Sequence, residues 1–207
     1  MTRINFLSII ISESYESLAK LGLPLEKTLD SAIGESDGVF EVKMKPMEQF
    51  ESLLDELREA CQVAYGDRLI SLVVFGSVGR RLPRPDSDID LLLIVDSLPD
   101  GRLCRVREFD KIEKRLQSAL EKARDSGVDT RFSPIFKTPD EVRMGSPLFL
   151  DMIEDAWALF DREGFFASTI SALKERLRGL GARRIWRGDF WSWDLKSDFK
   201  PGEVFEF

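Results

Sequence analysis

Residues 73–95 read VVFGSVGRRLPRPDSDIDLLLIV and carry the most informative pattern in the chain. An apolar run ends at Gly76-Ser77, ten residues follow, and a second apolar run opens with Asp88-Ile89-Asp90. Leu91 to Val95 is apolar without alternation, which is typical of a strand buried in the middle of a sheet. The pattern therefore predicts two buried strands joined by a polar loop, with two carboxylates at the start of the second strand.

Asp88 and Asp90 are the candidate metal ligands. Residues i and i+2 of a strand share one face, so both carboxylates project the same way, roughly 6.5–7 Å apart along the chain. Two like charges this close repel each other, and a divalent cation removes the repulsion. Mg²⁺ is commonly bound by one or two carboxylates together with substrate phosphates. An isolated Asp-x-Asp can also simply form a turn or a cap, but the joint pattern favours a metal site.

Gly76, Ser77 and the two arginines that follow are the candidate nucleotide-binding residues. Gly76 lacks a Cβ atom, so a phosphate can approach the backbone closely. Ser77 offers a hydroxyl, and backbone N–H groups at such a turn can face an anion. Arg80 and Arg81 add positive charge with a geometry suited to phosphate. No Gly-Lys-Ser/Thr follows, so the loop is not a Walker A loop, and it is not a Rossmann fingerprint either.

These residues resemble the nucleotidyltransferase superfamily that includes DNA polymerase β, and more closely its minimal nucleotidyltransferase (MNT) branch. The shared features are the Gly-Ser-x10-Asp-x-Asp motif and an opening that is often Gly-Ser-x-Ala-Arg-Gly. Here Gly79 stands in place of the usual Ala and Arg81 in place of the usual Gly. The resemblance covers about residues 46–161. It implies an α/β (α+β) nucleotidyltransferase fold, with a small mixed β-sheet, helices packed on one face and the substrate cleft on the other.

The resemblance also implies a third carboxylate on a neighbouring strand, and residues 127–136 are the candidate segment. Alternation predicts one apolar face directed at the core and one polar face with Asp129, Arg131 and Ser133. Asp129 would then be the third catalytic and metal-binding acid, or the general base for the acceptor hydroxyl. The alternative is that Asp129 pairs with Arg131 or caps the preceding turn.

The activity implied by the resemblance is a Mg²⁺-dependent transfer of a nucleoside monophosphate from a nucleoside triphosphate to an acceptor hydroxyl. ATP is the expected donor, and one or two Mg²⁺ ions are the expected cofactors. Minimal members often pair with HEPN-domain proteins as toxin–antitoxin modules, and some adenylylate a partner's tyrosine. Two alternatives stay open: a non-catalytic antitoxin that binds nucleotide or partner, and an enzyme acting on an aminoglycoside-like small molecule.

Composition narrows the remaining classes of function. The chain has 207 residues and a net charge of −7, which disfavours general binding to duplex DNA. No histidine is present, so His-based catalysis and His-ligated zinc are excluded. Cys61 and Cys104 have no metal-binding spacing and are expected to be reduced. The apolar run Phe6–Ile11 is too short to span a bilayer, and we expect a cytoplasmic protein, with a homo-oligomer left open.

The order of the predicted elements divides the chain into three parts. We expect an N-terminal extension (1–45), a nucleotidyltransferase domain (46–164) and a C-terminal helix with an aromatic, basic tail (165–207). The tail residues 181–193 could pack on the domain, bind a protein or stack on bases. The expected helices are 46–65, 103–125 and 165–179, with short helical segments at 138–141 and 149–155; the expected strands are 69–75, 88–96, 127–136 and 157–160.

Overall fold

The computed structural model describes residues 46–187, 190–196 and 198. The extension predicted for residues 1–45 lies outside these described residues. Within them, no helix is long enough and apolar enough to cross a bilayer.

A four-stranded mixed sheet forms the centre of the described domain. The strand order is β3-β2-β1-β4, with β1–β2 and β1–β4 antiparallel and β2–β3 parallel. The mixed α/β fold predicted from the sequence is therefore confirmed. The bounds are β1 Leu69–Phe75, β2 Ile89–Val95, β3 Phe132–Lys137 and β4 Trp157–Asp161.

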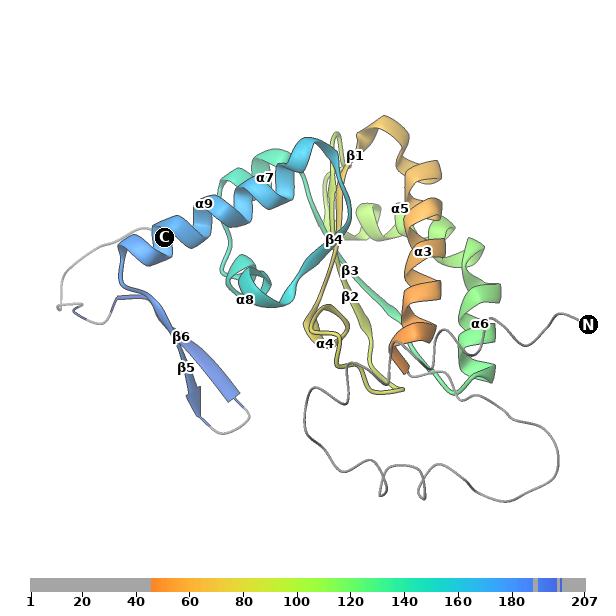
Figure 1. Ribbon diagram of the computed structural model, residues 1–207. Coiled ribbons are helices and arrows are strands. Elements are labelled where there is room, and N and C mark those ends of the chain that lie inside the picture. Colours follow the sequence, from red (N-terminus) through yellow and green to blue (C-terminus); the bar gives the residue numbers. More distant parts are fainter. Residues whose placement is uncertain (1–45, 188–189, 197, 199–207) are drawn as a thin grey trace, which may run out of the picture. The chain divides into compact units, whose positions relative to one another are not determined.

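One face of the sheet is covered by α3 (Pro46–Tyr65), α5 (Arg102–Arg115) and α6 (Gln117–Asp125), which lie together on one side in Figure 1. The apolar side chains of α3 from Phe50 to Cys61 are buried against the sheet, whereas Ala64 near the end of the helix is exposed. Gly66 ends this helix with φ +53°, a left-handed conformation that glycine adopts without steric cost. The core on this face includes Phe50, Leu54, Leu57, Leu91, Leu93, Phe109 and Ile112.

The other face is covered by α7 (Pro139–Arg143), α8 (Leu148–Asp155) and α9 (Phe165–Gly179), on the opposite side of the sheet in Figure 1. This differs from the expectation that helices pack on one face only. Leu92 and Ile94 of β2 are fully buried on this second face, and such apolar side chains require cover. The second core consists of Val73, Phe75, Leu92, Ile94, Val142, Phe149, Met152, Phe166 and Ile170.

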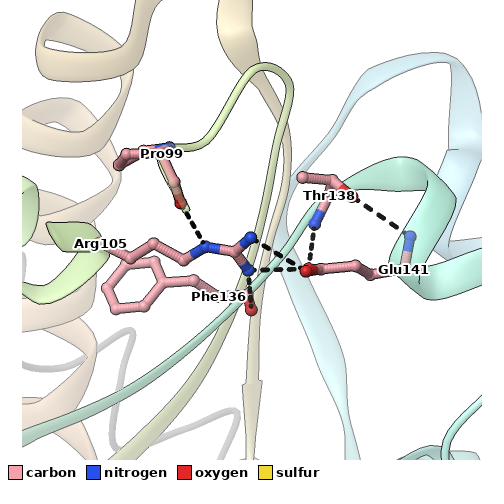
Figure 2. A network of polar contacts seen from close by, with 5 residues as sticks. All are labelled: Pro99, Arg105, Phe136, Thr138 and Glu141. Carbon is pink, nitrogen blue, oxygen red and sulfur yellow. Dashed lines mark hydrogen bonds and ion pairs between the residues drawn. The ribbon is translucent and has the colours of Figure 1, made fainter. Parts of the chain in front are cut away.

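One polar network joins the two layers of helices around the outer edge of β3 (Figure 2). The guanidinium of Arg105 on α5 donates from Nη1 and Nη2 to the carboxylate of Glu141 on α7, at 2.8 and 2.9 Å. Arg105 Nε also donates to the carbonyl of Pro99 at 2.9 Å. Glu141 accepts from the backbone N–H of Thr138, whose hydroxyl in turn caps α7. The interaction fixes the start of α7 against α5.

Three segments differ from their predicted form. The predicted helix 103–125 is two helices, because the backbone at Leu116 has φ −90° and ψ 3°. The predicted strand 127–136 begins only at Phe132. The tail contains an antiparallel hairpin that the sequence did not predict, formed by β5 (Arg183–Arg187) and β6 (Phe190–Asp194).

Candidate active site

The Gly-Ser turn lies directly against the carboxylate of Asp90. β1 and β2 are antiparallel with Phe75 opposite Asp90, so the residue after β1 meets that side chain. A Cβ atom at Gly76 would lie 2.2 Å from Asp90 Oδ2, and Gly76 also has φ +68°. Glycine is therefore required twice, by the backbone conformation and by the close approach. The turn opens a four-residue helix, α4 (Gly76–Gly79), in which Ser77 is half-buried.

The Asp90 side chain is half-buried near the start of β2, on the face of the sheet that α7, α8 and α9 cover. It shares this face with Leu92 and Ile94, in keeping with the alternation along β2. Burial raises the pKa of Asp90, and the negative charge of Asp88 raises it further. A hydrogen bond from the Ser133 hydroxyl and the positive charge of Arg80 act in the opposite direction. Asp90 is thus a carboxylate whose charge the apo protein only partly compensates.

Asp88 lies just before β2 and its side chain is 46% exposed. Its Oδ1 atom is 3.5 Å from Nε of Arg131, the residue before β3. The parallel register then places Ser133 opposite Asp90. The neighbouring strand therefore presents an arginine and a serine to the two acids, at the level where the resemblance implied a carboxylate. Alternation along the sequence predicts Ser133 on the polar face, but nothing in the sequence assigns it a role.

The structure does not bring Asp129 to the other two acids. Its carboxylate accepts a hydrogen bond from Arg124 Nε at 3.0 Å, its side chain is 72% exposed, and its backbone N–H binds the carbonyl of Pro85. The predicted alternation is confirmed, since Val128 and Thr130 are buried, but the strand starts at Phe132, five residues later than predicted. Across the described residues, no group of three or more His, Cys, Asp or Glu side chains could hold a metal ion. Of the three acids predicted to form one cluster, the structure therefore places Asp129 apart from Asp88 and Asp90.

The two arginines of the loop point to different neighbours. Arg80 Nη1 lies 3.7 Å from Oδ2 of Asp155 at the end of α8, and its charge also acts on Asp90. Arg81 instead donates to Glu51 of α3 at 2.8 Å, with its guanidinium 4.9 Å from the ring centroid of Trp157. Arg80 thus keeps its predicted place near the acids, whereas Arg81 is engaged on the α3 side.

Both departures from the resembled opening have a structural basis. A Cβ atom at Gly79 would lie 2.3 Å from the carbonyl oxygen of Asp155, so the usual alanine has no room. Arg81 adopts φ +59°, a left-handed conformation that favours glycine. Its contacts with Glu51 and Trp157 offset this strain. Neither feature is readable from the sequence, because Glu51, Asp155 and Trp157 come from three other elements.

A cavity of about 410 Å³ opens beside Asp88, between α5 and β3. A second cavity, of about 530 Å³, shares Arg102 and Pro134 with the first and continues along β3 toward Glu141. The first cavity contains Arg102 and Arg131 as well as acidic side chains. Its mixed charge does not match the deep acidic pocket that an aminoglycoside-like substrate would need. It offers room for a nucleotide or an acceptor next to Asp88.

Solved structures similar to the chain include the crystal structure of a toxin–antitoxin with AMP-PNP. The sequence identity is 18% and the TM-score 0.37, over 65% of this chain and 92% of that chain. A crystal structure of a mutant of the toxin–antitoxin MntA–HpeT matches with 18% identity and a TM-score of 0.37, over 64% of this chain and 91% of that chain.

Sequence comparisons identify the family. The model of the nucleotidyltransferase domain matches residues 54–145. A Methanocaldococcus jannaschii protein named "Putative protein adenylyltransferase MJ1305" is 30% identical over 125 residues, which cover 59% of this chain and 80% of that protein. Residues 54–145 contain the Gly-Ser turn and both acids of the site. The chain belongs to the nucleotidyltransferase family.

Proposed function

We propose that the chain transfers a nucleoside monophosphate from a nucleoside triphosphate, with ATP as the donor, to an acceptor hydroxyl. The observation that carries this proposal is the contact between the Gly76 turn and the Asp90 carboxylate. Gly76 provides a backbone that a phosphate can approach, and Asp90 provides a carboxylate suited to a metal ion. The two residues are in van der Waals contact. A triphosphate and its counter-ion require this combination.

Asp88 and Asp90 are the residues that would hold the metal ion. Mg²⁺ is usually bound through one or two carboxylates plus substrate phosphates, so a pair of acids without a third fits an ion that arrives with its nucleotide. The negative charge of Asp90, which its protein neighbours compensate only in part, supports this fit. When bound, one or two Mg²⁺ ions supply positive charge against the phosphate oxygens. The Ser133 hydroxyl then orients Asp90, and Arg131 orients Asp88.

The remaining residues bind and orient the donor. The backbone at Gly76 and the Ser77 hydroxyl face the phosphates, and Arg80 supplies a positive charge on the same side as Asp90. The acceptor oxygen attacks the α-phosphorus, and a new P–O bond forms. The bond between the α-phosphorus and the bridging oxygen breaks, pyrophosphate leaves, and the acceptor's proton is released to water.

For the acceptor we propose a protein hydroxyl. The name of the similar M. jannaschii protein, an adenylyltransferase of proteins, supports this class. The motif's resemblance to the minimal branch supports a HEPN-domain protein as the partner.

A second candidate function is a non-catalytic antitoxin that binds nucleotide or partner without turnover. One observation favours it: Arg131 and Ser133 lie where the resemblance implied a carboxylate, and Asp129 pairs with Arg124. Without a third acid, none of the residues that the structure describes offers the site a carboxylate placed to act as general base.

ATP labelled at the α- or the γ-phosphate, incubated with Mg²⁺ and the protein product of the adjacent gene, separates the two functions. Nucleotidyl transfer moves the α-label to protein and releases the γ-label as pyrophosphate. We expect Asp88→Asn and Asp90→Asn to lower transfer by about a hundredfold or more, since both remove charge at the reacting phosphates. Asp129→Asn is the matched control and should retain transfer within about threefold. Tight partner binding with neither label transferred would overturn the enzyme and support the non-catalytic antitoxin.

A further inference from the structure

Two arginines from distant parts of the chain lie beside one carboxylate, that of Asp155 at the end of α8. Arg184 of β5 donates from Nη2 to Asp155 Oδ2 at 3.0 Å. Arg80, next to the Gly-Ser turn, places Nη1 3.7 Å from the same oxygen. The side chains of Asp155 and Arg184 are only 14% and 16% exposed, whereas that of Arg80 is 42% exposed. Arg184 is therefore the close, shielded partner of Asp155, and Arg80 is the loose, exposed one.

The backbone holds Asp155 beside the nucleotide loop. Gly79 packs so tightly on the carbonyl of Asp155 that a Cβ atom there would lie 2.3 Å from it. This contact keeps the backbone of Asp155 beside Arg80, and the hydrogen bond from Arg184 holds its carboxylate there. Two arginines thus compete for one oxygen, and the hydrogen-bonded partner in the more shielded position binds more strongly.

A second acid, Asp151, also interacts with both arginines. Asp151 lies one turn earlier on α8, and burial and the charge of Asp155 raise its pKa while the charges of Arg184 and Arg80 lower it. Two carboxylates and two arginines therefore share this region. Without Arg184, the positive charge of Arg80 would act on both carboxylates without this competing arginine.

We propose that Arg184 is a positioning residue of the nucleotide site: by neutralising Asp155, it leaves Arg80 available to the triphosphate. The C-terminal hairpin is then part of the site rather than an appendage. The inference rests on the proposed function in one respect, that the triphosphate binds at the Gly-Ser turn. The inference also states the direction of the effect of Asp155. Its carboxylate competes with the nucleotide for Arg80 and does not orient Arg80 toward the nucleotide.

The neighbouring arginine provides a matched control. Arg183 lies on the same strand but pairs with Asp194 across the hairpin, with Nε 3.2 Å from Oδ2. Arg183→Ala removes the same charge from the same strand, and the ion pair it breaks lies within the hairpin. Arg184→Lys keeps a positive charge near Asp155.

The test is the affinity of the full chain for Mg²⁺–tripolyphosphate, measured by titration calorimetry. We expect Arg184→Ala to weaken binding about tenfold, and the double variant with Asp155→Asn to recover most of that loss. Arg183→Ala should bind like the wild type, and Arg184→Lys should lie between the wild type and Arg184→Ala. Thermal unfolding of each variant separates a loss of binding from a loss of fold.

Two results would overturn the inference. Wild-type affinity in Arg184→Ala would show that Arg184 does not act on the site. A double variant as weak as Arg184→Ala would show that Asp155 does not compete for Arg80. Transfer of the α-label from ATP is measured in parallel. If the affinities follow the predicted order but no label is transferred, the proposed transferase activity is wrong and the role of Arg184 stands.

Discussion

Gly76 combines two structural demands in one residue. Its φ of +68° disfavours any residue with a Cβ atom, and the missing Cβ leaves the space that Asp90 occupies. We expect Gly76→Ala to destabilise the protein by about 2–4 kcal/mol and to abolish nucleotide binding. Chemical denaturation and calorimetry measure the two effects.

Gly164 is the matched control for Gly76. It has the same φ of +68°, but nothing lies within 4 Å of a Cβ atom placed there. Gly164→Ala should cost only about 1 kcal/mol, which is the conformational penalty alone. Equal losses in the two variants would show that contact with Asp90 contributes nothing.

The raised pKa of Asp90 gives metal binding a defined pH dependence. A proton and the metal ion compete for the same carboxylate, so affinity for Mg²⁺ or Mn²⁺ should fall as the pH drops through a range above the ordinary Asp value of about 3.9. In the metal-free protein the native carboxyl retains its proton to higher pH than the unfolded chain does. Its contribution to stability therefore declines as the pH rises from the ordinary value to the raised one.

Asp90→Asn removes this charge and tests both effects. The metal-free variant should be more stable at neutral pH than the wild type and should no longer bind the ion. Thermal unfolding with and without Mn²⁺, at several pH values, gives both readings. Metal binding by the wild type that stays constant down to pH 4 would contradict the assignment of Asp90 as a ligand.

Arg81 is the residue at which the sequence was most misleading. Two adjacent arginines after a Gly-Ser turn suggest phosphate binding, yet Arg81 contacts Glu51 and Trp157. Arg81→Gly should change stability by less than about 1 kcal/mol, because relief of the left-handed backbone offsets an exposed ion pair and a cation–π contact. The affinity for Mg²⁺–ATP should stay within about twofold of the wild type. A tenfold loss would instead place Arg81 at the nucleotide.

At the scale of elements, the pair of Arg105 and Glu141 links α5 to α7 (Figure 2). The hydrogen bonds from Arg105 hold the pKa of Glu141 below its usual range, so the stability that this pair contributes is present at neutral pH and is lost as the pH falls. Glu141→Gln should cost about 1.5–3 kcal/mol, since it leaves a largely buried guanidinium without its charged partner. Chemical denaturation at pH 7 measures the loss.

The exposed pair of Asp140 and Arg143 on α7 is the control for that substitution. Both side chains are mostly exposed and lie three residues apart on one helix. Asp140→Asn should cost no more than about 0.5 kcal/mol. Similar losses for Asp140→Asn and Glu141→Gln would mean that the link around β3 adds nothing beyond a surface ion pair.

The elements that depend on local signals were predictable. The bounds of α3, β1 and α9 agree with the sequence because each combines a clear apolar period with a glycine or proline at its ends. The break at Leu116 and the late start of β3 were missed. The break was missed because the apolar stripe of the helix continues through Leu116. The late start of β3 was missed because residues 127–131 alternate like a strand although they lie before it.

At the scale of the whole molecule, the sequence placed the two acids and the Gly-Ser turn but not their surroundings. The pair is local, since Asp88 and Asp90 are two residues apart and β2 follows directly. The partners Ser133, Asp155 and Arg184 come from three separate elements, and only the packing of those elements brings them to the site. Helices were expected on one face only, although β2 is apolar on both faces and so requires cover on both.

The most direct test is the position of the metal ion in crystals of the chain grown with Mn²⁺ and a non-hydrolysable ATP analogue, located by its anomalous scattering. We expect a peak about 2.1 Å from carboxylate oxygens of Asp88 and Asp90, with the triphosphate along Gly76 and Ser77. A peak and a nucleotide at any other place, with the two carboxylates left uncoordinated, would contradict this expectation.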